Sequence, residues 1–157
     1  MPDVPAQFAP AQSRPDLREM ARLERAMRES YHAADSAPVA PEALSQIPED
    51  ALPQLRMGFA PSLRLIRSRY PLYDIWAANM ANGPAPRAAA QSVLITRPEF
   101  DPVPDPLGTD DAAILDALIA GAPLGQALRR AAPGYDVSAL LLRLLQRRAL
   151  ISLTIEE

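Results

Sequence analysis

The sequence has 157 residues, a length typical of one domain or of two small modules that share a core. It contains no cysteine and only one histidine, His32, which excludes disulfides, zinc–thiolate sites, iron–sulfur clusters, cysteine nucleophiles and histidine-rich metal sites. The formal charge of −3 does not favour a nucleic-acid or anionic-membrane partner. No apolar run reaches the ~20 residues of a membrane span and no signal pattern opens the chain, so we expect a cytoplasmic protein with no membrane partner.

The N-terminal part predicts a tail followed by a long amphipathic helix. Residues 1–14 are rich in proline and alanine without periodicity, which is typical of a disordered tail. Pro15 and Asp16 favour a helix start, and apolar residues then recur at spacings of three and four as far as Tyr31. His32 ends this helix, and we interpret it as a surface residue because no second imidazole is present to share a metal.

Prolines dominate the next segment, residues 36–55, and leave room only for one-turn helices such as Pro41–Ser45 and Pro48–Leu52. Beyond it, Leu63 and Leu65 alternate with polar neighbours and predict a short strand.

A short helix is predicted from Pro71 to Met80, and residues 82–91 read as a linker. We therefore expect a first module over residues 15–81 and a second module over residues 92–157.

The second module alternates strands and helices in a regular order. We expect a strand over 92–97, an extended stretch over 100–107, three short helices and a closing strand over 151–155. This order is the plan of a winged helix-turn-helix. The predicted fold class is therefore α+β, with an N-terminal helix and a proline-rich irregular module packed on a winged-helix-like module.

Four residues mark the helix ends within this module. Thr109 is the predicted N-cap of the first helix, and Gly121 ends it. Pro123 begins the second helix, and Asp136 caps the third.

The residue inventory argues against catalysis by this chain. The single imidazole cannot serve an activated serine from outside the motif-rich region, and the six glycines are too scattered to form a phosphate loop. The carboxylate pair Asp110 and Asp111 suits the start of a helix, and Glu156 and Glu157 suit a solvated terminus. We predict no catalytic residue, no metal ligand and no cofactor in this chain.

A winged helix also invites a DNA-binding interpretation. The third helix would be the recognition helix, and its basic residues are Arg143, Arg147 and Arg148. All three lie in its second half, whereas bases are usually read from the N-terminal part. Residues 88–157 carry six arginines against nine acidic residues, which disfavours phosphate contacts. A DNA-binding regulator therefore stays as the alternative function.

Positive charge gathers instead in residues 54–70, which contain four arginines and no acidic residue. The aromatic residues in or beside this segment are Phe59, Tyr70, Tyr73 and Trp76. Arginine together with tyrosine and tryptophan is typical of interface hot spots. The same residues equally fit a buried core flanked by solvated arginines, and composition alone leaves both interpretations open.

Prolines alternate along the second strand of the C-terminal module, at positions 102, 104 and 106. Because successive N–H groups of a strand point to opposite sides, the three missing donors fall on one edge. The outer edge is therefore expected to offer carbonyls without donors, which weakens pairing with an added peptide strand. A peptide would dock elsewhere, on 92–97 or 152–155, or would rely on side-chain pockets.

Three stretches of the chain resemble one bacterial family over roughly residues 16–157. They are Leu23-Glu24 with Glu29, Tyr31 and His32–Asp35; Pro61–Trp76; and Leu107–Gly121. The family, often labelled as DNA-binding, contains the partner proteins of multinuclear non-haem iron-dependent oxidases. Those oxidases modify cysteines in ribosomally made peptides, including the copper-binding bufferins.

The resemblance implies a non-catalytic subunit that docks on the iron oxidase and helps to recognise the leader of a cysteine-containing precursor peptide. Iron would belong to the partner enzyme and not to this chain. Two departures from the family pattern stand out. Many members carry a further helical domain before the first-helix signature, so we expect this chain to be a short variant. Ala60 also stands where relatives usually have histidine.

Two groups of residues follow from this hypothesis. The expected oxidase interface consists of Arg64, Arg67, Tyr70 and Trp76. The leader peptide is expected between the small sheet and the third helix, near Leu94, Thr96, Leu141 and Arg148.

Overall fold

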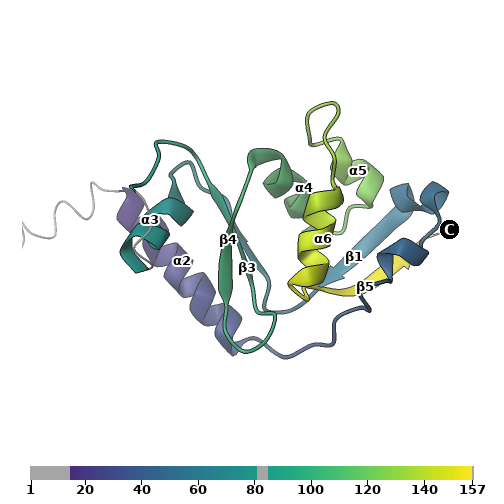
Figure 1. Cartoon of the computed structure of the whole chain (residues 1–157), viewed down its shortest axis with the longest axis horizontal. Coiled ribbons are helices and arrows are strands. Elements are labelled where there is room, and N and C mark those ends of the chain that lie inside the picture. Colours follow the sequence, from purple (N-terminus) through teal and green to yellow (C-terminus); the bar gives the residue numbers. More distant parts are fainter. Residues whose placement is uncertain (1–14, 81–84, 157) are drawn as a thin grey trace, which may run out of the picture.

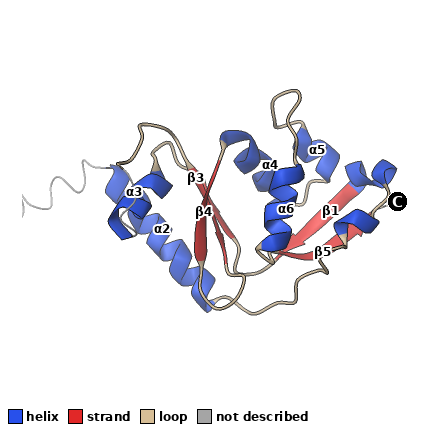
Figure 2. Cartoon of the chain, viewed as in Figure 1, coloured by secondary structure: helices blue, strands red, loops and turns tan. Residues whose placement is uncertain are grey.

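The computed structural model describes residues 15–80 and 85–156. Within these residues the chain is an α+β protein with one three-stranded and one two-stranded antiparallel sheet (Figure 2). The predicted tail over residues 1–14 lies outside the described residues. In the part of the chain that is described, no helix is long and apolar enough to cross a membrane.

The three-stranded sheet lies at the centre of the molecule. Its strands are β2 (Arg64–Ile66), β3 (Ser92–Thr96) and β4 (Val103–Leu107), in the order β2-β3-β4. All five residues of β3 are buried, because helices or further strands cover both faces of the sheet (Figure 1). The alternation along β3 therefore sends neighbouring side chains into two different hydrophobic clusters.

One face of the sheet packs against α2 (Pro15–His32) and α3 (Leu72–Met80). We call this the N-terminal cluster. Its buried members are Leu23, Ala26, Ile66, Leu72, Val93 and Ile95. The predicted apolar stripe of α2 is correct at its centre but shorter than expected, because Leu17 and Tyr31 at its two ends are exposed.

The other face contributes Leu94 of β3 and Leu107 of β4 to the central cluster. This cluster is built from five further elements, which are β1 (Leu55–Phe59), α4 (Thr109–Ile119), α5 (Leu124–Leu128), α6 (Ser138–Gln146) and β5 (Leu150–Ile155). The 3₁₀ helices Leu44–Gln46 and Glu49–Gln54 precede β1, close to the two one-turn helices that the prolines predict. Strand β1 itself is not among the predicted elements.

The expected division into two modules differs from the way the core is built. Strand β1 pairs with β5, from Leu55 opposite Ile155 to Phe59 opposite Leu150, and β2 pairs with β3. Both hydrophobic clusters therefore contain residues from either side of the 82–91 segment. The end of that segment is tied to α3, because Asp74 accepts hydrogen bonds from Arg87 and from the Gln91 side chain.

The predicted end of α4 at Gly121 is correct, whereas the N-cap positions of α4 and α6 are held by Gly108 and Val137 and not by the predicted Thr109 and Asp136. Gly121 has φ +97° and closes α4, since the Ala122 N–H donates to the Ala117 carbonyl in a Schellman motif. Asp136 Oδ1 accepts the Ser138 N–H at 2.9 Å, at the start of α6. Thr109 is not the N-cap of α4: Gly108 occupies that position, and no side chain caps this helix end.

Candidate functional site

The four residues expected to bind the leader peptide do not share one surface. Leu94 and Thr96 are 0% and 1% exposed, because β3 is the central strand of a sheet covered on both faces. Leu141 is half-buried on α6, and Arg148 is exposed just beyond the end of α6. In this conformation only Arg148 of the four offers its full side chain to a docked peptide.

Two arginines cross the space between the small sheet and the third helix: Arg143, which belongs to α6, and Arg147, which directly follows it. Arg143 Nη1 donates to the Pro106 carbonyl at 3.0 Å. Arg147 Nη2 lies 2.9 Å from a carboxylate oxygen of Asp105. These contacts hold α6 against β4, where the sequence hypothesis places the leader.

Strand β4 forms an edge of its sheet, and its prolines lie on the outer side of that edge. The register places Leu94 opposite Asp105, with Val93 and Ile95 opposite Pro106 and Pro104. Proline has no N–H, so the ladder hydrogen bonds from β4 to β3 come from the residues between the prolines. The outer edge thus offers only carbonyls, and Arg143 already occupies the Pro106 carbonyl.

A hollow lies on a different side of α6, between this helix and the proline-rich segment 38–41. Its volume is about 510 Å³. The residues that line it are Pro38, Val39, Ala40, Pro41, Leu142, Leu145, Gln146 and Arg148. The segment is held in place by the Val39 N–H, which donates to the Leu150 carbonyl at 2.8 Å. Leu142 is 54% exposed there, so an apolar surface is open to solvent.

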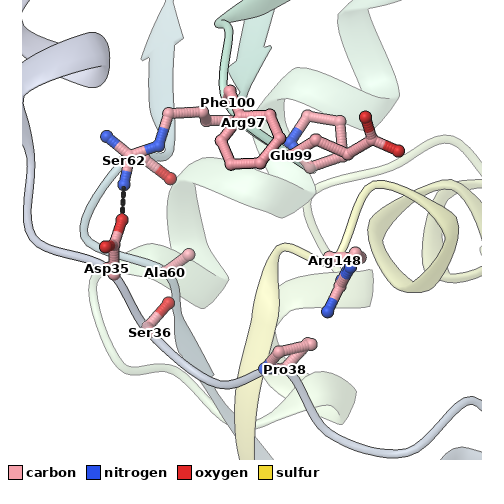
Figure 3. Close-up of a pocket in the computed structure, with 10 residues that line it drawn as sticks. Asp35, Ser36, Pro38, Ala60, Ser62, Arg97, Glu99, Phe100 and Arg148 are labelled. Atoms are coloured by element: carbon pink, nitrogen blue, oxygen red, sulfur yellow. Dashed lines mark hydrogen bonds and ion pairs between the residues drawn. The ribbon is translucent and has the colours of Figure 1, made fainter.

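A second hollow, of about 530 Å³, adjoins the first and shares Pro38 and Arg148 with it. Figure 3 shows these two residues across the hollow from Glu99 and Phe100, which belong to the loop between β3 and β4. Phe100 is 83% exposed. The two hollows together form what we call the Arg148 groove, with an apolar end along α6 and a polar end at the β3–β4 loop.

Arg148 has an unusual backbone conformation. Its φ is +56°, the left-handed region that L-residues seldom adopt. Like Gly121 after α4, it closes a helix: the Arg148 N–H donates to the Leu145 carbonyl and the Ala149 N–H to the Leu144 carbonyl. Among the described residues, none of the ion pairs involves Arg148. Sequence reasoning selected this residue but had no signal for its conformation.

The residues expected at the oxidase interface differ in accessibility. Arg64 is directed toward α2, where its Nε lies 3.4 Å from Glu29. Trp76 packs against the N-terminal cluster, with its ring centroid 5.8 Å from that of Tyr73. Arg67 is half-exposed, and its Nη1 atom lies 3.7 Å from a carboxylate oxygen of Asp116. Tyr70, three positions further along the chain, is half-buried.

The local excess of positive charge in residues 54–70 does not persist as a positive surface. Acidic residues from distant elements lie within ion-pair distance of three of the four arginines. Arg56 pairs with Glu156 at 3.2 Å, and Arg64 and Arg67 pair as described above. For Phe59, Tyr73 and Trp76, the structure agrees with the core interpretation, since each packs against a hydrophobic cluster.

Two carboxylates have clear structural roles. The hydrogen bond from the Gln91 side chain, together with those from Arg87, lowers the pKa of Asp74. Asp111 accepts a hydrogen bond from the Tyr135 hydroxyl, which ties the loop before α6 to α4. Burial raises the pKa of Tyr135 above its ordinary range, and the bond to Asp111 acts in the same direction.

Over residues 15–80 and 85–156, no three side chains of His, Cys, Asp or Glu gather closely enough to hold a metal ion. Comparisons with protein-family models, with curated proteins and with solved structures find no match to this chain.

Proposed function

We propose that this chain is a non-catalytic partner subunit of a multinuclear non-haem iron oxidase. In this proposal it docks on the oxidase and helps to recognise and present a ribosomally made, cysteine-containing precursor peptide. The iron and the chemistry at the cysteine belong to the oxidase. The resemblance of Pro61–Trp76 and of Leu107–Gly121 to the partner-protein family motivates the proposal.

The single observation that carries it is the Arg148 groove. Two adjoining hollows with an apolar end, an exposed aromatic residue and one arginine without an ion partner among the described residues suit an extended peptide. Helices α4, α5 and α6, followed by β5, would act as the winged-helix-like peptide-recognition module. The groove then runs beside its third helix, on the side away from β4.

We propose that the surface of this chain that docks on the oxidase is centred on Arg67, with Tyr70 and Trp76 three and nine positions further along the chain. Arg67 is the most accessible residue of the expected interface, and its ion pair with Asp116 is long and exposed. A pair of this kind contributes little to stability, so Arg67 can exchange its partner for one on the oxidase at low cost.

Co-expression with a multinuclear non-haem iron oxidase from the same organism tests the proposal. Size-exclusion chromatography with mass determination should show a complex of defined stoichiometry. Arg67→Glu should weaken it by about tenfold or more. Arg130→Glu, the matched change at an exposed arginine outside the expected interface, should leave it intact. Separate elution of two folded proteins would contradict the proposal.

A DNA-binding regulator is the alternative. Two of the three arginines that would serve a recognition helix, Arg143 and Arg147, are engaged with β4. A titration with duplex DNA over a range of salt concentrations distinguishes the two functions. Tight binding with a steep salt dependence would favour the regulator.

A further inference from the structure

We propose, resting on the function proposed above, that the Arg148 groove selects a peptide segment in which an acidic residue adjoins two aliphatic residues. The carboxylate would pair with Arg148, and the aliphatic side chains would lie along α6. The occupant is thus a precursor peptide of acidic and aliphatic character at its recognised segment.

The apolar end of the groove explains why we expect two aliphatic residues in the bound peptide. Val39, Leu142 and Leu145 contribute branched aliphatic side chains, and Pro38 and Pro41 complete the wall opposite the helix. Leu142 is more than half exposed, so a ligand side chain placed here would remove it from water. Among the residues that the structure describes, Arg148 is the one charged residue that lines this end.

The positive charge of Arg148 explains why we expect an acidic residue in the bound peptide. Arg148 stands where the two hollows meet, and no acidic side chain among the described residues pairs with it. A guanidinium can accept a carboxylate through two parallel hydrogen bonds, which gives direction as well as affinity. Asp35, the acidic residue at the far side of the polar hollow, is already paired with Arg97 at 2.9 Å.

The backbone of Arg148 supports a role in binding. A helix that ends in a Schellman motif usually has glycine at this position, as α4 has at Gly121. Arginine at φ +56° is less favourable than glycine there, so the side chain is not explained by the needs of the helix end. A strained residue at the centre of a groove is a recognised sign of function.

The polar end sets the orientation of the peptide. Glu99 lines it together with the exposed ring of Phe100. A second acidic residue of the ligand would be repelled by Glu99, whereas an apolar residue would contact Phe100. The acidic residue is therefore expected near the middle of the recognised segment, with aliphatic residues toward α6 and a neutral residue toward the β3–β4 loop.

Selection from a phage-displayed library of random dodecapeptides on the immobilised full chain tests this inference. Enriched peptides are then synthesised with a fluorophore and titrated by anisotropy. They should share an acidic residue next to two aliphatic residues. Arg148→Gly should weaken their binding by about tenfold or more, and Leu142→Ser by several-fold. Added salt should weaken binding to the native chain more than to Arg148→Gly.

Two matched control variants show whether a loss of peptide binding is due to Arg148 itself. Arg147→Ala alters an arginine that faces β4, and Arg130→Ala alters an exposed arginine that lines neither hollow; both should bind the peptides as the native chain does. Circular dichroism establishes that each variant is folded. Three results would overturn the inference: consensus peptides without an acidic residue, equal affinity of Arg148→Gly and the native chain, or no enrichment above bare support.

This outcome is separate from that of the oxidase experiment. If the oxidase complex forms but the peptides ignore Arg148, the inferred specificity is wrong and the adaptor function stands. If the peptides bind through Arg148 but no oxidase complex forms, the inferred peptide binding in the groove is supported and the proposed partner is wrong.

Discussion

The Nη1 atom of Arg97 lies 2.6 Å from the carbonyl oxygen of Ser30, so the residue that follows β3 closes the C-terminal end of α2. The same guanidinium reaches the carbonyls of Tyr31, Ala33 and Ala34. A cation at this end of a helix satisfies carbonyls that have no partner in the helix, and it opposes the negative end of the helix dipole. The bond therefore fixes the loop after α2 against the β3–β4 loop, and both line the polar end of the Arg148 groove.

Replacing Arg97 should destabilise the chain strongly. Its side chain is only 7% exposed, and Arg97→Ala would leave several carbonyls without a donor. We expect a loss of about 2–4 kcal/mol in the free energy of unfolding, measured by urea denaturation. Arg97→Lys should recover part of the loss, because an ammonium restores the charge but cannot reach all the acceptors. Asp35→Asn, which alters an exposed partner, should leave the unfolding midpoint almost unchanged.

Arg148→Gly should make the chain more stable. Glycine keeps the positive φ but has no Cβ to clash with the following carbonyl, which relieves about 1–2 kcal/mol, and the greater freedom of glycine in the unfolded chain costs about 0.5–1 kcal/mol. The net gain of about 0.5–1 kcal/mol corresponds to a rise in Tm of roughly 1–4 °C by scanning calorimetry. Arg148→Ala keeps the unfavourable φ and should give no such rise. A lower Tm for Arg148→Gly would contradict the strain described for this residue.

Acid should weaken the link between α3 and the segment before β3. Because the pKa of Asp74 is lowered in the folded chain, its contribution is complete above the unfolded pKa near 3.8 and is lost as the pH falls through the folded value. Asp74→Asn should thus have a lower Tm than the native chain at neutral pH. The difference should disappear as the pH falls through the lowered pKa of Asp74, in thermal melts followed by circular dichroism. A difference that persists unchanged in acid would mean that the charge of Asp74 is unimportant.

Tyr135→Phe should loosen the loop that precedes α6. The hydroxyl of Tyr135 donates to Asp111, and its loss is expected to cost about 1 kcal/mol in urea denaturation. Because the pKa of Tyr135 is raised, its stabilising effect is complete below pH ~10 and is lost only as the pH rises through the folded value. Ultraviolet absorbance during an alkaline titration should show a late phenolate step that Tyr135→Phe lacks.

Local patterns predicted the elements well where a single helix or turn decides the structure. The helix from Pro15 to His32, the glycine end of α4 and the edge position of the β4 prolines all follow from residues close together in the chain. Strand β1 was missed although Leu55 and Met57 alternate with polar residues, because its partner lies 100 residues away, with Leu55 opposite Ile155. Proline-rich flanks made this stretch resemble a surface segment.

The site was harder to predict because it depends on contacts between distant elements. Alternation along β3 indicates two faces but not that both are covered, so Leu94 and Thr96 could not be recognised as buried. The charge of residues 54–70 was counted without Glu29, Asp116 and Glu156, which only the fold brings near. Arg148 was predicted to lie in the second half of the third helix, whereas α6 ends at Gln146, and the left-handed backbone of Arg148 leaves no mark in the sequence.

The pairing of β1 with β5 also determines the order in which this chain can complete its fold. During synthesis, β1 emerges long before its partner, and β2 likewise precedes β3. A fragment that ends at residue 80 would contain β1 and β2 but not β5 and β3, the strands that pair with them. Each strand would then have unpaired N–H and C=O groups. Such early strands invite pairing with other copies, so expression of the first half alone should give aggregates, and the last strand should be decisive for recovery of folded protein.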